Sequence, residues 1–534
     1  MRFLASVRVR IFLVCWILFS LFFATNVVRE HYPAFALLDR GDFKCDRYAN
    51  MHADLFQHTD GHWYVGNNLL GSMPAVVVLA IFDPVLDRLE EHSKRKLAES
   101  PAEADATYDT KYPNRQKMWR LVKQAGLELR FGASTALTSV FLMAPLSAWF
   151  AVLVFGVLQR RGVERGRAVW LALLFAFGTP VFYRTAHLNH NMFVMEALFG
   201  AFLVVWLGSD ERRELSLGKR IAFGALLGTT CALDYAGFVL AAVTFLYFFV
   251  PRLSAAGLAR TVRESITIAL AGVPFIAFLL WTQWLMYGDP FTPGQKVMPH
   301  QNEYVDQGYR GIGLPVPEIF LKNLIAPGWG LYAFAPLLLI ALLPAARVMK
   351  AEKLVFPVRE RRWAFAIVLS FMLFCAANWY SLLQFNTGFR YLLPCVPFLF
   401  LSACDGLARM RPGWLALLSA LVIGHGVVLS MAREVNDTEN LLRHEAVEQG
   451  ISELSLPGYW PRMLTETPVP VAYRRVFSTE GPQLPWLTVA KQTQPALREK
   501  LASPWLPVGL LAVAVAACLG LWRLGARAEA RRGA

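Results

Sequence analysis

Acidic residues gather in one polar stretch, residues 30–71, that directly follows the first apolar run of the chain. Glu30, Asp46 and Asp54 are the candidates for chemistry there, because a base that deprotonates a hydroxyl group needs a carboxylate held in a partly dry site. An equally weighted alternative for each of them is that it caps a turn or a short helix. Asp60 precedes Gly61 and is predicted to be a turn residue.

Arg390 is the strongest candidate for binding an anion. It lies at the predicted mouth of an apolar run, between Phe389 and Tyr391, and a guanidinium fork matches the geometry of a phosphate. The alternative is that Arg390 only anchors a helix at the membrane interface. His187 and His190 can bind substrate or be interfacial polar residues. A metal role would need further ligands that the sequence does not supply, so neither a metal nor a cofactor is predicted.

The composition excludes an ordinary soluble protein. Hydrophobic residues make up 55% of the 534 and charged residues only 17%, against about 25% charged residues in soluble domains. Many of the Lys and Arg residues behind the net charge of +14 lie in short clusters between apolar runs, which is the pattern of membrane topology rather than of nucleic-acid binding. No pair of cysteines has the spacing of zinc ligands, and neither a zinc site nor a disulfide framework is expected.

Apolar runs of about 17 to 25 residues predict an all-α polytopic membrane protein with about twelve transmembrane helices. Residues 1–28 form the first span. Basic residues precede it and no small-x-small cleavage site ends it, so a retained signal anchor is expected. Two short apolar runs flank Asp234, which is predicted to cap the bend between them, with a functional role as the alternative.

The run 69–86 decides the predicted topology. It is apolar enough to span the membrane, yet it contains Gly71, Pro74, Asp83 and Pro84. If it lies in the interface and the N-terminus is cytoplasmic, nearly every basic cluster falls inside, as the positive-inside rule requires. The predicted organisation is then an extracytoplasmic first loop (29–132), a transmembrane core (133–431), an extracytoplasmic segment (432–504), and a last span with a basic tail (505–534).

Several short motifs follow one another along the chain. The pattern G-x-F-x-x-D, a further D and then D-G-H-x-Y is matched by residues 41–46, Asp54 and residues 60–64. Later motifs are Gly178-Thr179-Pro180, Tyr287-Gly288-Asp289-Pro290-Phe291, the segment 327–336, and Gly388 to Pro394. In this order they resemble the lipid-carrier-dependent glycosyltransferases of the GT-C fold, which include protein O-mannosyltransferases and the aminoarabinose transferases of lipid A.

The resemblance covers most of the chain as far as about residue 431. It implies a GT-C-like fold with a large first extracytoplasmic loop that contains juxtamembrane helices. It also implies substrate-binding or phosphate-binding roles for His62, Tyr64, His187 and Asp289, with Asp46 or Asp54 as the base that activates the acceptor hydroxyl and Glu30 as a third candidate.

One position departs from the family pattern. Where the family has S-x-K-P-P after the tyrosine, this chain has Val65-Gly66-Asn67-Asn68-Leu69, so Asn67 replaces the lysine that the resemblance places at the carrier phosphate. Asn67 can donate hydrogen bonds but brings no charge. Three interpretations stay open: Arg390 or another basic residue takes this role, the donor is bound differently, or the activity is altered.

The resemblance implies an inverting, metal-independent glycosyltransferase in the bacterial cytoplasmic membrane, with its site facing outward. It would move a sugar from a polyprenyl-phosphate donor to a glycan, lipid or protein acceptor, among membrane lipids and without nucleic acid. One alternative is a transporter or flippase of a lipid-linked intermediate, although such proteins tend to contain paired repeats and charges near the midplane. The other is a non-catalytic assembly protein of the same fold.

Overall fold

The structure, a computed structural model, is helical apart from one short hairpin in the described part of the chain. That part comprises residues 2–25, 27–101, 104, 113–208, 211–298, 311–326, 330–343, 354–378, 381, 390–432, 468–479, 481–487, 490, 500–501 and 503–533. The predicted segment 432–504 therefore lies largely outside it, as does the start of the motif Gly388 to Pro394.

The elements are numbered in chain order, with η for a 3-10 helix and, at η5, a π-helical turn. The first are η1 (Arg2–Ala5), α1 (Val7–Leu21), α2 (His31–Arg40), η2 (Asp46–Tyr48), β1 (Leu55–Gln57), β2 (Trp63–Val65), η3 (Leu69–Gly71), α3 (Met73–Glu99) and α4 (Pro113–Gln124). Next come α5 (Glu128–Thr138), η5 (Ser139–Met143), α6 (Ala144–Arg160), α7 (Arg165–Phe177), α8 (Val181–Arg184), α9 (His190–Trp206), α10 (Leu217–Leu233), α11 (Gly237–Ala256), α12 (Leu258–Tyr287) and α13 (Gly294–Val297). The last are α14 (Pro317–Ile325), α15 (Leu331–Phe334), η6 (Pro336–Leu342), α17 (Val358–Ala377), η9 (Arg390–Cys395), α18 (Val396–Leu407), α19 (Pro412–Met431), α22 (Pro468–Val476) and α25 (Leu506–Gly533).

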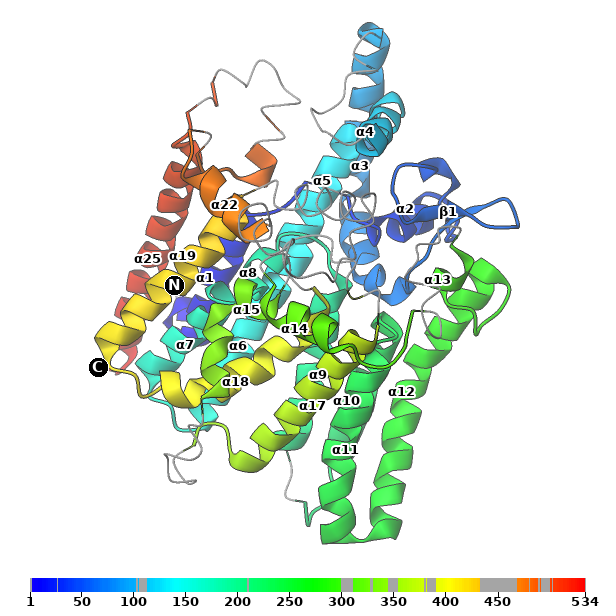
Figure 1. Cartoon of the computed structure of the whole chain (residues 1–534). Helices are drawn as coiled ribbons and strands as arrows, with labels where there is room; N and C mark the ends of the chain where they lie inside the picture. Colours follow the sequence, from blue (N-terminus) through cyan, green and yellow to red (C-terminus); the bar gives the residue numbers. More distant parts are fainter. Residues whose placement is uncertain are drawn as a thin grey trace.

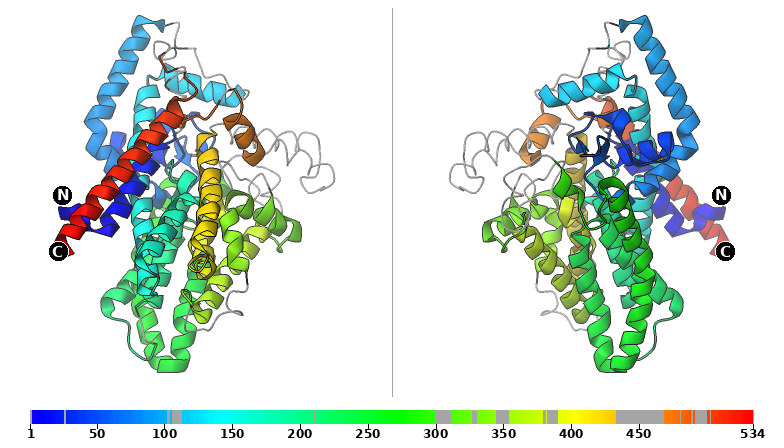
Figure 2. Two further views of the ribbon diagram at one scale, coloured as in Figure 1. Left: turned by 90° about the vertical axis from the view of Figure 1, so that its left-hand side faces the viewer. Right: turned by 90° about the vertical axis from the view of Figure 1, so that its right-hand side faces the viewer.

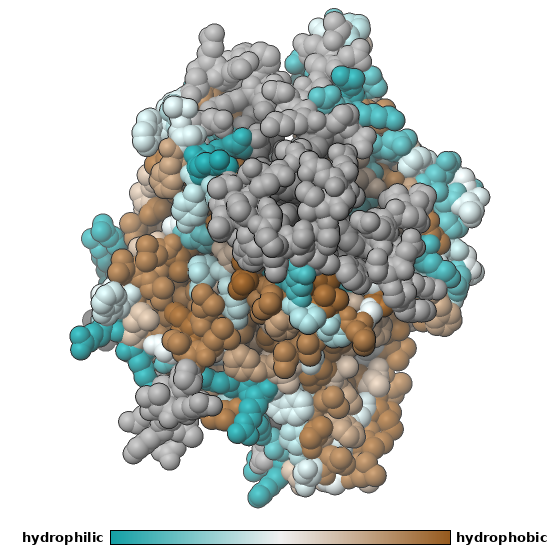
Figure 3. All heavy atoms as spheres, in the orientation of Figure 1, coloured by the Kyte–Doolittle hydropathy of each residue, from teal (hydrophilic) through white to brown (hydrophobic). Residues whose placement is uncertain are grey.

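Seven helices in the described part of the chain are long and apolar enough to cross a membrane. They are Leu69–Glu99, Glu128–Arg160, Gly237–Ala256, Leu258–Tyr287, Arg390–Leu407, Pro412–Met431 and Leu506–Arg531. Hydrophobic side chains also dominate the surface of the helical body below the first loop (Figure 3). The chain is therefore a helical, multi-pass membrane protein, as its composition predicts.

The other predicted spans coincide with shorter or broken helices. Helix α1 has 15 residues, α7 has 13, and α9 and α10 have 17 each, whereas about 20 residues cross the hydrocarbon core. The apolar segment 330–343 contains two short helices, α15 and η6, in place of one long helix. The total of about twelve spans stays a prediction.

Contacts between distant charged residues bring the basic segments together. Glu529 of α25 pairs with Arg10 of α1 and with Arg165 of α7, and the two termini accordingly lie close together (Figure 2). Further links between basic segments are Arg161 to the carbonyl of Val355, Arg167 to the carbonyl of Met410, and Arg359 to Glu211. A buried ion pair joins α11 to α12 near the turn between them: Arg252 of α11 lies 3.3 Å from Glu264 of α12.

Helix α3 is longer than the predicted helix at 69–86, because it continues past Pro84 to Glu99. It runs antiparallel to α5 and η5 (Figure 1). The ring of Phe82 stacks on that of Phe141 at 5.3 Å, and further along α3 Lys94 lies against Gly126, just before α5. Its position relative to the bilayer stays a prediction.

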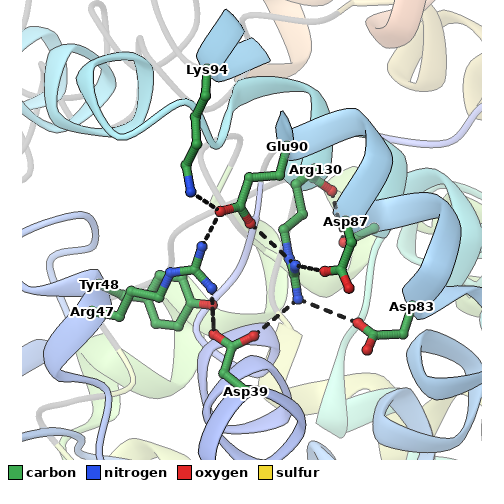
Figure 4. Close-up of polar contacts among 9 residues, drawn as sticks. Asp39, Arg47, Tyr48, Asp83, Asp87, Glu90, Lys94 and Arg130 are labelled. Atoms are coloured by element: carbon green, nitrogen blue, oxygen red, sulfur yellow. Dashed lines mark hydrogen bonds and ion pairs between the residues drawn. The ribbon is translucent and has the colours of Figure 1, made fainter. Parts of the chain in front are cut away.

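A group of ion pairs, which we term the Arg130 junction, joins α2 and η2 to α3 and α5 (Figure 4). Arg130 is 2% exposed and pairs with Asp39 of α2 at 3.0 Å and with Glu90 of α3 at 3.2 Å. Arg47 pairs with the same two carboxylates, so the four side chains form a closed ring of alternating charge. Arg130 also pairs with Asp83 at 3.4 Å and Asp87 at 2.6 Å.

Candidate functional site

Five ionisable side chains from four distant segments meet beside the start of α9, and we term them the inner cluster. Glu30 lies just before α2, and its Oε1 lies 3.4 Å from Arg29 Nε and 2.6 Å from His190 Nδ1. The other ring nitrogen of His190 lies 3.3 Å from Asp234 Oδ2. Arg29 Nη1 in turn contacts Asp54 Oδ2 at 3.3 Å. The contacts thus run in one chain from Asp234 through His190, Glu30 and Arg29 to Asp54.

Local structure fixes each of these side chains. His190 is the first residue of α9, and the side chain of Asn189 caps that helix by accepting a hydrogen bond from the amide of Asn191 at 3.0 Å. Asp234 ends α10, where its Oδ1 accepts a hydrogen bond from the amide of Ala236 at 2.9 Å. The predicted capping role of Asp234 is therefore confirmed, and its second oxygen is left for His190.

The hairpin of β1 and β2 positions Asp54. The two strands pair antiparallel, with Leu55 opposite Val65, and the turn between them is closed by Asp60, whose Oδ1 accepts a hydrogen bond from the amide of His62 at 2.9 Å. Asp60 is therefore the turn residue that its position before Gly61 predicts. The hairpin in turn packs on the end of α12, where the hydroxyl of Tyr287 donates a hydrogen bond to the carbonyl of Val65 at 2.9 Å.

Exposure differs across the inner cluster in a way that indicates an open side and a closed side. The side chains of Glu30 and His190 are 6% and 3% exposed, whereas that of Asp54 is 34% exposed. Burial works to raise the pKa of Asp54, but the nearby Arg29, His52 and Arg390 hold that pKa below its usual range. Asp234 is intermediate at 19%, so Asp54 is the most exposed of the three carboxylates of the cluster, and its neighbours favour its ionised form.

Arg390 and His187 act on the same cluster. The guanidinium of Arg390 contributes electrostatically to Asp54 and to His187, and its Nε is buried without a hydrogen-bond partner among the described residues. Burial and the neighbouring Arg184 and Arg390 lower the pKa of His187 to about 3, so this imidazole is neutral at pH 7. Its Nε2 is likewise buried and unpaired within the part of the chain that the structure describes.

Asp46 and His62 belong to a second, more exposed group, the outer cluster, with Arg40 and Lys44. Asp46 Oδ1 accepts a hydrogen bond from the amide of Trp63 at 2.7 Å, and its Oδ2 accepts one from His62 Nδ1 at 2.9 Å. His62 Nε2 lies 3.1 Å from Lys44 Nζ, and Arg40 lies 3.7 Å from Asp46. Both oxygens of Asp46 therefore hold the loop together. Burial works to raise the pKa of Asp46, but the donors Trp63, His62 and Arg40 outweigh it and lower that pKa.

The remaining predicted site residues lie in structural settings. Tyr64 is 2% exposed in an apolar group with Phe56 and Tyr287, and its hydroxyl donates to Asp60 at 2.9 Å. Asp289 closes the exposed turn after α12, where its oxygens accept from the Phe291 amide and the Thr292 hydroxyl. Asn67 follows β2, and its Nδ2 is buried without a partner among the described residues.

The structure thus brings Glu30 and Asp54 together and adds two residues: Arg29, which the sequence did not single out, and Asp234, for which a functional role was only the alternative to capping. The signal for Asp234 was available, because an acid between two short apolar runs is costly at membrane depth and usually faces a cavity or a partner. Among the described residues, no group of three or more His, Cys, Asp or Glu side chains could hold a metal ion.

Comparison of the chain with known protein families, with curated proteins and with solved structures finds no significant match.

A tight contact behind His190 gives a direct test of the cluster. A Cβ added at Gly71 would lie 2.8 Å from the Cβ of His190, so Gly71→Ala must displace that histidine. We expect the variant to lose about 1–3 kcal/mol of stability, as overpacked sites do, measured as a lower midpoint of thermal unfolding in detergent. Gly132→Ala is the matched control, because nothing lies within 4 Å of its added Cβ; an equal loss in both variants would contradict the contact.

Proposed function

We propose that the protein is a glycosyltransferase that moves a sugar from a polyprenyl-phosphate donor to a hydroxyl group of a glycan, lipid or protein acceptor. The observation that carries the proposal is the joint placement of Asp54 and Arg390, a partly exposed carboxylate within the electrostatic reach of a guanidinium. Transfer from a phosphate donor needs a base for the acceptor and a cation for the leaving phosphate, and these two side chains supply one each.

In the proposed reaction Asp54 accepts the proton of the acceptor hydroxyl. The acceptor oxygen attacks the anomeric carbon of the donor, and the bond from that carbon to the phosphate oxygen breaks, leaving the electron pair on the polyprenyl phosphate. Attack opposite the leaving group inverts the anomeric centre. No residue forms a covalent intermediate, and no metal takes part in this scheme.

Two buried groups without partners among the described residues support an anion site near the inner cluster: the Nε donor of Arg390, and Nε2 of His187, which is a donor in the tautomer that carries the ring proton there. The Nδ2 of Asn67 is a further buried donor without a partner in the described part of the chain. A buried donor left unpaired costs about 1–3 kcal/mol, so a ligand that accepts from these groups would be favoured. A phosphate that engages Arg390 would also draw positive charge away from Asp54. The pKa of Asp54 would then rise toward the range in which a carboxylate is a better base.

The proposal extends to the membrane arrangement. The inner cluster would lie at the extracytoplasmic face of a bacterial cytoplasmic membrane, and the joined basic segments around Glu529 would lie in the cytoplasm, as the positive-inside rule favours. A GT-C-like fold with about twelve spans would accommodate both, with the short helices α1, α7, α9 and α10 crossing a locally thinner apolar layer.

The test is sugar transfer in liposomes that contain the purified protein and a panel of radiolabelled polyprenyl-phosphate sugars. Transfer of label from the organic-soluble donor to an acceptor, dependent on the protein, is the expected result. Movement of the donor across the bilayer without transfer would indicate a transporter instead. Binding of a donor with neither transfer nor movement would favour a non-catalytic assembly protein.

A further inference from the structure

We propose that His190 is a permanently charged imidazolium, and that His190 and Asp234 are positioning residues that hold Arg29 against Asp54. The charge state of His190 follows from geometry and does not depend on what the protein transfers. Its positioning role rests on the proposed function, because it concerns the base of that reaction.

The hydrogen-bond geometry requires two N–H groups on one ring. Each ring nitrogen of His190 faces a carboxylate oxygen, at 2.6 Å on the Glu30 side and 3.3 Å on the Asp234 side. An ionised carboxylate can only accept hydrogen bonds, and a neutral imidazole has one donor nitrogen and one acceptor nitrogen. In the neutral form one lone pair would therefore point at an oxygen anion inside a site that is 3% exposed. Only the imidazolium satisfies both contacts.

The charges around His190 agree with this assignment. Glu30 from the segment before α2 and Asp234 from the end of α10 face the ring and favour its charged form, while Arg29 opposes it. Arg390 belongs to η9, which packs on α9, and it acts on Asp54 and His187. Burial of the ring is the strongest influence against the charged form, but the hydrogen bonds to the two carboxylates outweigh burial and Arg29 together, so the imidazolium is the stable form.

The contacts also give His190 a mechanical role. Asp234 is fixed to the backbone through the amide of Ala236, His190 is fixed by Asp234, and Glu30 is fixed by His190. The same oxygen of Glu30 that accepts from His190 also accepts from Arg29, whose remaining end reaches Asp54. Each link thus orients the next, and Glu30 takes part through Oε1 in a site where its side chain is only 6% exposed. Asp54, at 34% exposed, is the carboxylate at the open end of this chain and is assigned as the reactive one.

Asp234→Asn tests the positioning role. The amide keeps one oxygen to accept from the Ala236 amide, as Asp234 Oδ1 does, so the fold should survive. It turns an NH2 donor toward His190 Nε2 in place of the carboxylate oxygen Oδ2, so it removes one of the two charges that hold the proton on the ring. We expect near-normal transfer at acidic pH and a fall in kcat on the alkaline side that begins at least one pH unit lower than in the wild-type protein, with KM little changed. A purely structural role would lower activity equally at every pH.

Glu164→Gln is the matched control. Glu164 also caps a helix through backbone amides, those of Gly166 and Arg167, but it lies at the end of the molecule where the basic segments meet. Its pH profile should coincide with that of the wild-type protein. An unchanged alkaline limb in Asp234→Asn, or the same shift in Glu164→Gln, would overturn the positioning role.

The charge state is measured separately, by nitrogen NMR of protein labelled at its ten histidines. We expect one imidazolium signal that persists at pH 8 in the wild-type protein and is missing in His190→Gln. Ten neutral signals at pH 8 would overturn the assignment. A persistent imidazolium in a protein that transfers no sugar would refute the proposed function and the positioning role while the charge assignment stood.

Discussion

Asp54→Asn should reduce kcat for sugar transfer by about 10²- to 10⁴-fold, the usual contribution of a general base. The amide has nearly the same shape as the carboxylate but cannot accept the acceptor's proton. Asp54 is 34% exposed and, among the described residues, pairs with Arg29, which retains Glu30 as a partner. The fold should therefore persist, which the elution volume and the midpoint of thermal unfolding would show.

Asp46→Asn is the informative comparison for that experiment, because the sequence alone left Asp46 and Asp54 as equal candidates. In the structure both oxygens of Asp46 are engaged by the amide of Trp63 and by His62. We expect this variant to lose less than about tenfold in kcat, since it loosens the outer cluster without removing the base. Full activity of Asp54→Asn, or a larger loss in Asp46→Asn than in Asp54→Asn, would contradict the assignment.

Acid should inhibit sugar transfer by the wild-type protein only weakly when the substrates are dilute. Arg29, His52 and Arg390 hold the pKa of Asp54 in the free protein below its ordinary value against the effect of burial. We therefore expect kcat/KM, which reports the free protein, to stay constant across a pH series in liposomes until the pH falls below the ordinary range of an aspartate side chain. Loss of activity with a midpoint near neutral pH would indicate that another group is the base.

The helical membrane architecture could be predicted because it depends on composition and on the length of apolar runs. The turns could be predicted because they depend on neighbouring residues in the sequence. Asp60 closes a turn and Asp234 caps a bend, as their neighbours predict. The length of α3 was not predictable in the same way. Its second half is highly charged, and Asp83, Asp87 and Glu90 form a stable helical face only because Arg130, some forty residues later, lies opposite them.

The inner cluster could be predicted only in part for the same reason. Glu30 and Asp54 were found because acids are conspicuous beside apolar runs. The choice between Asp46 and Asp54 depended on the partners of each carboxylate in the folded chain. Asp54 lies among the distant residues Arg29 and Arg390, whereas Asp46 is bound by Trp63 and His62 of the adjacent hairpin. Nor does the spacing of His190 and Asp234 reveal that a single imidazole bridges two carboxylates.

Arg130→Met should cost more stability than any of the other substitutions, about 3–5 kcal/mol, the range for breaking a buried ion pair. Arg130 is 2% exposed and is shared by Asp39, Asp83, Asp87 and Glu90. Without it the four carboxylates retain only Arg47 and Lys94 as basic partners in the junction (Figure 4). Thermal unfolding in detergent would measure the loss, and limited proteolysis should cut the first loop sooner.

Lys94→Met is the control, because Lys94 pairs with Glu90 in the same junction but its side chain is 55% exposed. An exposed pair is worth about 0–1 kcal/mol, so this variant should unfold almost like the wild-type protein.

The pH dependence of the free energy of unfolding gives a second check on Arg130→Met. Burial works to raise the pKa of Glu90, but Lys94, Arg47 and Arg130 hold that pKa below its ordinary value. In the wild-type protein Glu90 therefore contributes stability that is lost as the pH falls through its folded-state pKa, whereas Arg130→Met lacks part of this contribution already at neutral pH. The gap between the two proteins should therefore narrow as the pH falls, and a gap that stayed constant would mean that Arg130 acts through packing alone.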